Sequence, residues 1–415
     1  MANVSVGKHP LPDGWHWVRL GEVCMFNPRR PELRRSDDEL TTFVPMAAVD
    51  EAGRGISRAE LKPFAEIKRG YTYFGEGDVL FAKITPCMQN GKHAIARNLT
   101  DGIGFGSTEF HVIRPGPTIV REWVHLFVLQ PWVLQEATAH FSGAVGQQRL
   151  PEAYLSGLEI PLPPLAEQKR IAAILNDQMS AIERARAAAE TRLEAAKALP
   201  AAYLRQVFES EEAESWPRKR LGEVCRSMQY GLSLPMNDDG RGYPVIRMNN
   251  IKDGTIDINE IRYVEVEHAQ AKKFALEKGD ILVNRTNSAE LVGKSAVFDR
   301  EGDQVYVFAS YLIRLALLRE VAVPHYVAFA LNSRVGREYV ERTLRRAIGQ
   351  ANINSQEIAA FEFPLPPVAR QERLAAQVGD KMTAVKGACR ALEEQLDTIN
   401  KLPAALLRRA FSGGL

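Results

Sequence analysis

Pro-Leu-Pro-Pro-Leu-Ala-Glu-Gln-Lys-Arg at residues 161–170 returns as Pro-Leu-Pro-Pro-Val-Ala-Arg-Gln-Glu-Arg at residues 364–373, an offset of 364 − 161 = 203. Leu-Pro-Ala-Ala follows each copy at the same offset, at 199–202 and 402–405. Arg-Leu-Gly-Glu-Val-Cys precedes them at 19–24 and 220–225, an offset of 220 − 19 = 201. Two copies of one unit of about 200 residues therefore make up the chain. Such a duplication predicts a pseudo-two-fold molecule that offers two similar surfaces to one long partner.

A heptad-like apolar stripe follows each Pro-rich stretch. Between the stripe positions the residues are mostly Ala, Glu, Lys, Arg and Gln, so each stripe predicts one long helix of roughly 35 residues. Because neither helix can bury its stripe alone, we expect the two helices to form an antiparallel intramolecular coiled coil. The alternative is that each helix packs on its own neighbouring domain. The stripe positions are Leu165, Ile171, Leu175, Met179, Ile182, Ala185, Ala189, Leu193, Ala196 and Leu199 in the first copy, and Val368, Leu374, Val378, Met382, Val385, Ala388, Leu392, Leu396, Ile399 and Leu402 in the second.

A proline interrupts each stripe near its end. Pro200 and Pro403 suit the first turn of a helix, so we predict that a new short helix begins at each of them. The short helices carry apolar residues, and we expect these exposed ends to dock a partner protein. The predicted partner-binding residues are Tyr203, Phe208, Leu406 and Phe411.

The regions before the stripes contain short β-branched and aromatic runs separated by Gly, Pro, Asn and Asp. Each region also has a helical passage, at 121–141 and at 325–346. The predicted fold class is therefore α+β, with two mixed α/β globules separated by two long helices that form the antiparallel coiled coil. The predicted boundaries are 1–163 for the first globule, 164–210 for the first helix region, 211–366 for the second globule and 367–415 for the second helix region.

The composition is that of an ordinary water-soluble protein, with 45% hydrophobic and 25% charged residues and a net charge of +2. No apolar run of about 18 residues could span a membrane, and the N-terminal residues lack the apolar core of a signal peptide, so we expect a cytoplasmic location. The four cysteines are far apart, which argues against a zinc site or a disulfide framework. The small net charge permits nucleic-acid binding through local patches without indicating it.

Catalytic motifs are absent or incomplete. Gly293-Lys294-Ser295 resembles the end of a phosphate-binding loop but lacks the preceding glycine, and the glycines at 102–106 lead into a strand-like run, which favours a mobile turn. Asn27-Pro28 lacks the second proline and the aromatic residue of an amino-methyltransferase motif, and the histidines have no metal-helix spacing. We therefore predict that the chain is not an enzyme. A divergent DNA methyltransferase or nuclease, and a coiled-coil scaffold that does not bind DNA, are the alternatives.

Two pairs of polar loops recur in the globules and are candidate DNA contacts. One pair lies at 83–92 and at 284–294, and the other lies at 142–149 and at 345–352. Arg pairs with guanine, Asn and Gln pair with adenine, and Lys or Ser binds phosphate, so loops of this composition suit DNA recognition. The alternative is solvated loops with some capping amides. The predicted DNA-binding residues are Lys83, Thr85, Gln89, Asn90, Lys92, Gln147, Gln148, Arg149, Asn284, Arg285, Thr286, Asn287, Ser288, Lys294, Arg345, Arg346, Gln350 and Asn352.

Taken in order and twice over, these motifs resemble the specificity subunit of Type I restriction-modification systems. The resemblance rests on the Pro-Leu-Pro-Pro-x-x-x-Gln-x-Arg stretches, the Gly-Asp-Val-Leu and Gly-Asp-Ile-Leu strands at 77–80 and 279–282, the run at 285–288, the two Gly-Gln loops and the Arg-Leu-Gly-Glu-Val starts. It covers essentially the whole chain. It implies that each globule is a target recognition domain, and that the paired helices are a spacer and a platform for two methyltransferase subunits, which restriction subunits then join.

The resemblance also implies that this chain binds no nucleotide or S-adenosylmethionine. Those ligands and Mg²⁺ are expected only in the partner subunits. Two globules held apart by a rigid rod should contact two half-sites of duplex DNA about one helical turn apart. Because the two loop sets differ, we expect a bipartite, asymmetric site with a fixed gap.

Overall fold

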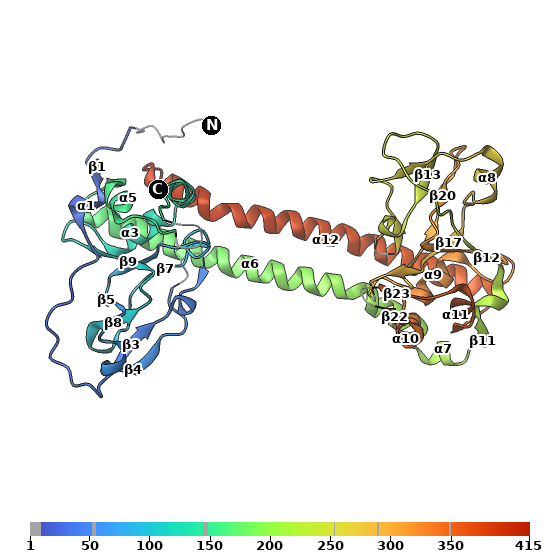
Figure 1. The fold of residues 1–415 in the computed structure, drawn as a ribbon, viewed down its shortest axis with the longest axis horizontal. Helices are drawn as coiled ribbons and strands as arrows, with labels where there is room; N and C mark the ends of the chain where they lie inside the picture. Colours follow the sequence, from blue (N-terminus) through green and yellow to red (C-terminus); the bar gives the residue numbers. More distant parts are fainter. Residues whose placement is uncertain (1–9, 52–54, 144–147, 253, 289, 348–349) are drawn as a thin grey trace. The chain divides into compact units, whose positions relative to one another are not determined.

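The structure is a computed structural model that describes the whole chain except residues 1–9, 52–54, 144–147, 253, 289 and 348–349. It divides into two compact units. The first unit consists of Met1–Glu190 with Glu394–Leu415, and the second unit is Thr191–Glu393. Each unit contains one globule and one segment of each long helix (Figure 1). Among the described residues, no helix is both long enough and apolar enough to span a membrane.

The long helices are α6 (Leu165–Phe208) and α12 (Val368–Phe411), of 44 residues each. The prediction that new helices begin at Pro200 and Pro403 is wrong, because both prolines lie inside continuous helices. An internal proline removes one backbone hydrogen bond and favours a kink. Buried residues on both sides of each proline, such as Ala196 and Leu204 around Pro200, hold the helix together across it.

Segments of α6 and α12 pack along one another inside each unit, and the directions are antiparallel. In the first unit, Ile182 in the first half of α6 packs with Ile399 in the second half of α12. In the second unit, Val207 at the end of α6 shares a core with Leu374 and Val378 near the start of α12. The predicted antiparallel pairing of the two helices is therefore confirmed.

Leu165, Leu199 and Leu402 of the predicted stripes are exposed rather than buried, and one position inside each stripe is shifted. Ala185 and Ala388 are exposed, while the neighbouring Arg186 and Cys389 are half-buried. The inward positions 182, 186, 189, 193 and 196 keep the alternating spacing of four and three that a heptad seam requires, whereas position 185 would break it.

The first globule is built from two four-stranded sheets and a short strand pair. The central sheet has the order β2-β9-β6-β7 and is antiparallel throughout. The second sheet has the order β4-β3-β8-β5, with β3 and β8 parallel. The strands are β1 (His16–Arg19), β2 (Cys24–Phe26), β3 (Leu40–Val44), β4 (Glu60–Pro63), β5 (Thr72–Gly75), β6 (Val79–Ala82), β7 (His93–Ile95), β8 (Ile103–Gly106), β9 (Phe110–Pro115) and β10 (Glu159–Leu162), which pairs with β1. The helices are α1 (Leu20–Val23), α2 (Phe64–Ile67), α3 (Arg121–Val128), α4 (Pro131–Ala139) and α5 (Glu152–Gly157).

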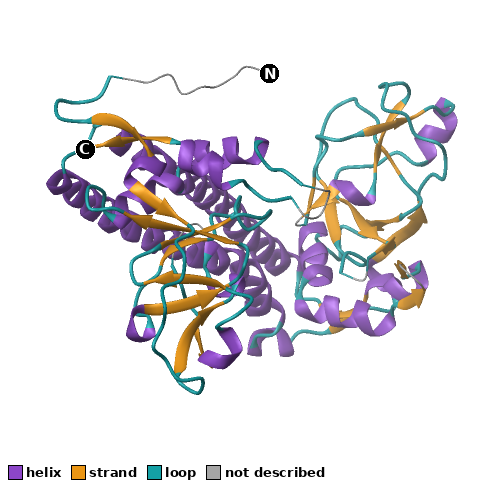
Figure 2. Cartoon of the chain, turned by 60° about the vertical axis from the view of Figure 1, so that its left-hand side comes forward, coloured by secondary structure: helices purple, strands orange, loops and turns teal. Residues whose placement is uncertain are grey.

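The second globule repeats this plan. Its central antiparallel sheet has the order β12-β21-β17-β19, and β13 pairs with β16 and, in parallel, with β20. The strands are β11 (Arg218–Arg220), β12 (Cys225–Tyr230), β13 (Tyr243–Ile246), β14 (Ile251–Lys252), β15 (Thr255–Ile256), β16 (Arg262–Val264), β17 (Asp280–Asn284), β18 (Thr286–Asn287), β19 (Ser295–Phe298), β20 (Val307–Phe308), β21 (Leu312–Leu317), β22 (Arg345–Ala347), β23 (Gln350–Asn352) and β24 (Glu362–Pro364). The helices are α7 (Glu211–Glu214), α8 (His268–Lys273), α9 (Pro324–Asn332), α10 (Arg334–Thr343) and α11 (Ser355–Ala359). Figure 2 shows this mixture of small sheets and short helices in both globules.

Two details differ from the sequence expectation. Each predicted helical passage is a pair of short helices, α3 with α4 and α9 with α10, and Arg345–Ala347 is a strand. The segment predicted to be a mobile turn is η3 (Thr100–Gly102) followed by the inner strand β8. Its glycines are needed for packing, because a Cβ on Gly104 would overlap the Phe74 ring and one on Gly106 would overlap a backbone carbonyl.

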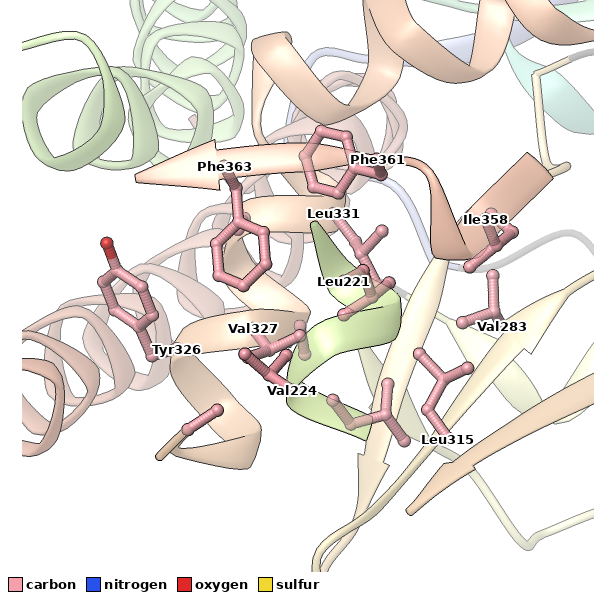
Figure 3. Close-up of a cluster of buried hydrophobic side chains, with 14 of the residues drawn as sticks. Leu221, Val224, Val283, Leu315, Tyr326, Val327, Leu331, Ile358, Phe361 and Phe363 are labelled. Carbon is pink, nitrogen blue, oxygen red and sulfur yellow. The ribbon is translucent and has the colours of Figure 1, made fainter. Parts of the chain in front are cut away.

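The end of each long helix completes a globule core. Phe411 of α12 lies 4.2 Å from Trp123 in the first unit, and Phe208 of α6 lies 5.1 Å from Tyr326 in the second, measured between ring centroids. Figure 3 shows Tyr326 within the second core, beside Phe363 and Val327.

This packing corrects the predicted partner-docking role of two residues. Phe208 and Phe411 are only 5% and 3% exposed, so they are used up in the chain's own cores and cannot dock another protein. Leu406 is half-buried against the first core, and the Lys381 ammonium lies 4.8 Å above the half-buried ring of Tyr203. Neither contact tests a docking role for these two residues.

A buried glutamine fastens each globule to the start of its long helix. Gln168 Oε1 accepts from the Val120 N–H at 2.9 Å, and its Nε2 donates to the Thr118 and Pro163 carbonyls. Gln371 makes the same three bonds to Val323, Val321 and Pro366. This joint explains why both Pro-rich stretches carry glutamine at the same position.

Candidate nucleic-acid interface

The two predicted loops of each unit meet at one residue, at the end of a central strand. In the first unit, Lys83 follows β6, donates its N–H to the Glu109 carbonyl at 2.9 Å and accepts from the Leu150 N–H at 2.9 Å. In the second unit, Arg285 follows β17 and makes the equivalent bonds to the Tyr311 carbonyl at 2.9 Å and the Ile353 N–H at 3.0 Å. The folds therefore present Lys83 and Arg285 at matching places, 285 − 83 = 202 residues apart.

Charged side chains surround this point in the first unit. Arg149 donates to both carboxylate oxygens of Glu109, at 2.6 and 2.9 Å, and this bond lowers the pKa of Glu109. Burial lowers the pKa of the Lys83 ammonium, while the carboxylate of Glu109 opposes that change. A carboxylate thus lies between two cations, and the cluster can both donate and accept hydrogen bonds.

Aromatic side chains surround the same point in the second unit. The Arg285 guanidinium carbon lies 4.6 Å from the centroid of the Tyr230 ring. Tyr311, which takes the place of Glu109, is 51% exposed. The equivalent positions therefore differ in charge, in shape and in hydrogen-bonding capacity.

Several other predicted residues of the first unit are accessible, and some already have partners in the chain. Thr85, Gln89 and Gln148 are exposed. Asn90 donates to the Glu51 carboxylate at 2.9 Å, and the Lys92 ammonium donates to the Val49 carbonyl at 2.9 Å. Gln147 lies outside the described residues.

In the second unit, the prediction for Asn284 is wrong. Its side chain is 1% exposed and its Nδ2 donates to the Leu291 carbonyl at 3.3 Å, so it holds the loop together from inside. Ser288 is exposed, while Asn287, whose side chain accepts from the Ser288 N–H, and Lys294 are half-buried.

A small sheet joins the two loops of the second unit, in the order β18-β23-β22. It pairs Thr286 with Asn352, which are both half-buried. Arg345, Arg346 and Gln350 belong to its strands, but their side chains lie outside the described residues.

Three residues of this site were missed in the sequence: Glu109, Tyr230 and Tyr311. Tyr230 ends β12, and Glu109 and Tyr311 directly precede the strands β9 and β21. They are far from the loops along the chain, and only strand pairing brings them close. One indication was available, since Glu109 and Tyr311 lie at the same offset of 311 − 109 = 202.

The site offers hydrogen-bond donors, acceptors and aromatic faces. Among the described residues there is no group of three His, Cys, Asp or Glu side chains that could hold a metal ion. The thiols of Cys24 and Cys225 pack in the globules, and burial raises the pKa of each to about 12. The side chains gathered here are of the types that bind base edges and phosphates.

Comparisons with known proteins give the family. The model of the Type I restriction modification DNA specificity domain matches residues 12–190 and again 213–396. The Type I restriction enzyme EcoEI specificity subunit of Escherichia coli is 24% identical over 480 residues, covering 92% of this chain and 80% of that protein. The EcoAI specificity subunit of Escherichia coli is 36% identical over 214 residues, covering 50% of this chain and 36% of that protein.

Solved structures share the fold. The HsdS subunit from Thermoanaerobacter tengcongensis superposes with a TM-score of 0.65 at 24% identity, over 99% of both chains. A second solved chain gives a TM-score of 0.74 at 24% identity, over 98% of this chain and 100% of that chain. Its structure is described as "Structural basis underlying complex assembly and conformational transition of the type I R-M system".

The fold and the family model together define a protein with two DNA specificity domains. The chain belongs to the Type I restriction-modification DNA specificity family, as a specificity subunit that carries both domains. A role in DNA recognition follows from that membership.

Proposed function

We propose that the chain binds a two-part, asymmetric DNA site, with the globule of residues 1–163 contacting one half and the globule of residues 211–366 contacting the other. One observation carries this proposal: the same backbone position presents Lys83 beside Glu109 in one unit and Arg285 beside Tyr311 in the other. Because the matching positions carry different chemistry, the two half-sites should differ in sequence.

The side chains suit base recognition in different ways. A carboxylate such as Glu109 can accept from the amino group of cytosine, and an arginine such as Arg285 can donate two hydrogen bonds to guanine. Gln89 and Ser288, in the loops that follow Lys83 and Arg285, are exposed and polar. Side chains of this type suit contacts with phosphates or base edges. Recognition of the first half-site should therefore depend on both the carboxylate and the cations around Lys83, and recognition of the second should depend on Arg285.

The chain's role in the complex is to direct other subunits. We infer that it contributes no catalysis, and that two methyltransferase subunits and the restriction subunits bring S-adenosylmethionine, ATP and Mg²⁺. Membership of the specificity family supports this division of labour. Since the substrate is the DNA of the cell, the complex would act in the cytoplasm.

Sequencing of methylated bases tests the proposal. The full chain is expressed with the methyltransferase subunit of its own system in a host that lacks other methyltransferases. We expect one motif with two unlike halves and a fixed gap. A palindromic motif, or methylation without a motif, would refute the asymmetric site. Calorimetry of the full chain with S-adenosylmethionine should show no binding, and tight binding would contradict a purely directing role.

A further inference from the structure

Arg285 is held both at its backbone and along one face of its side chain. Its backbone N–H and carbonyl are both bonded, to Tyr311 and to Ile353. Its guanidinium packs over the ring of Tyr230 at 4.6 Å, an attraction between a cation and an aromatic face. The backbone position of Arg285 is therefore fixed, and one face of its guanidinium is held against an aromatic ring.

Tyr230 is itself anchored at its far end. Its hydroxyl donates to Ser355 Oγ at 3.0 Å and accepts from the Ser355 N–H at 2.9 Å. Ser355 begins α11, whose N-terminal cap is the neighbouring Asn354, with its side chain bonded to the Glu357 N–H. The ring is thus fixed between a strand of the central sheet and the start of a helix.

Among the described residues, no carboxylate neutralises the charge of this guanidinium. Within the part of the chain that the structure describes, Arg285 makes no ion pair, and its Nε is buried without a hydrogen-bond acceptor. With Nε buried, the two Nη groups are the donors left for an acceptor from outside. Two neighbouring donors match the O6 and N7 acceptors of guanine.

The first unit shows what the same position looks like without this support. Lys83 replaces Arg285, and its neighbours are Glu109 and Arg149, with no aromatic ring among its described partners. A lysine is a flexible point charge without a fork. The oriented arginine is therefore a property of the second unit.

We propose that Tyr230 and Ser355 are positioning residues that orient Arg285 for one guanine in the half-site contacted by the second unit. The inference rests on the proposed function. A long side chain loses conformational entropy when it binds, and it loses less if its geometry is already set before binding. Loss of the Tyr230 ring or of its bonds to Ser355 should reduce the preference for guanine more than it reduces the overall affinity for DNA.

The test measures binding of the full chain, with its methyltransferase partner, to four duplexes that differ only at one base pair of the second half-site. Arg285→Lys, which keeps the charge and removes the fork, identifies that base pair. Wild type should prefer guanine by roughly 10- to 100-fold. Tyr230→Leu should reduce this preference to that of Arg285→Lys, and Tyr230→Phe and Ser355→Ala should each reduce it by about threefold.

Controls separate positioning from folding. Tyr243→Phe removes another tyrosine hydroxyl bond of the same unit, to His268 Nδ1 at 2.9 Å, and should leave the preference unchanged. Preferences within the first half-site should not move in any variant. If Tyr230→Leu fails to fold, Ser355→Ala decides, because Asn354 still caps α11.

Two outcomes are distinguishable. Equal weakening of all four duplexes by the Tyr230 and Ser355 variants, with the preference for guanine intact, would overturn the positioning role. A wild-type complex that binds all four duplexes equally, at every base pair tested, would instead overturn the proposed function.

Discussion

Replacing Gln371 by alanine should release the second globule from the start of α12. The buried side chain accepts from the Val323 N–H at 2.8 Å and donates to the Val321 and Pro366 carbonyls at 3.0 and 2.8 Å. Its removal leaves one donor and two acceptors without partners, at about 1–3 kcal/mol for each group. Water entering the space would restore part of this. We expect the free energy of unfolding of the second unit to fall by about 3 kcal/mol.

Hydrogen exchange followed by mass spectrometry localises this effect. In Gln371→Ala, the Val323 amide should exchange roughly 100-fold faster. The equivalent amide of the first unit, Val120, which is bonded to Gln168 at 2.9 Å, should keep its protection. Gln168→Ala should give the reverse pattern.

An exposed glutamine of the same helix supplies the matched control. Gln377→Ala should change the stability by less than about 0.5 kcal/mol. Unchanged protection of Val323 in Gln371→Ala, or equal loss of protection in both units, would refute the idea that this glutamine is a local joint.

Two further predictions concern the first unit. His93 is fully buried and His125 is half-buried, and burial lowers their pKa values to about 3 and about 4. Unfolded histidines bind protons below a pKa of about 6.5, so the stability of the first unit is fully present above that pH and should fall between pH 6.5 and 4. The fall should reach up to about 1.4 kcal/mol per pH unit for each histidine. Urea unfolding at pH 7.5 and 5 measures this, and a loss of stability between the two pH values that is the same in His93→Gln as in the wild type would contradict it. Phe411→Ala should destabilise the first unit by about 3 kcal/mol, because the Phe411 ring packs on Trp123. Leu402→Ala, at an exposed site on the same helix, should have little effect. Equal unfolding midpoints of these two variants in urea would count against this packing.

The repeat and the heptad pattern were sufficient to predict the two-unit fold and the antiparallel helices. The sequence did not show that α6 continues through Pro200, because local propensity favours a break there and only the burial of residues beyond it, such as Leu204, opposes the break. It also misplaced Phe208, since an apolar helix end looks the same whether it fills a core of its own chain or a partner's.

The candidate site was predicted as loops, and the strands beside them were missed. Arg285 was identified from a polar run, but Tyr230 lies 285 − 230 = 55 residues earlier and is brought close only by the pairing of β12 with β21 and of β17 with β21. Asn284 was assigned to the surface because it adjoins that run, yet it is the last residue of β17, a strand whose five residues are all buried. Residue type alone does not distinguish a polar side chain that faces the site, such as Arg285, from one buried beside it, such as Asn284.

Photo-crosslinking tests the central claim most directly. A photoreactive residue is placed at Gln89, at Ser288 or, as an exposed control on α12, at Lys401, in the full chain bound with its methyltransferase partner to the duplex that methylation sequencing identifies. We expect crosslinks from position 89 in one half-site, crosslinks from position 288 in the other, and none above background from position 401. Crosslinks from both loops to the same half-site, or no more than the control gives, would contradict the claim that each unit contacts its own half.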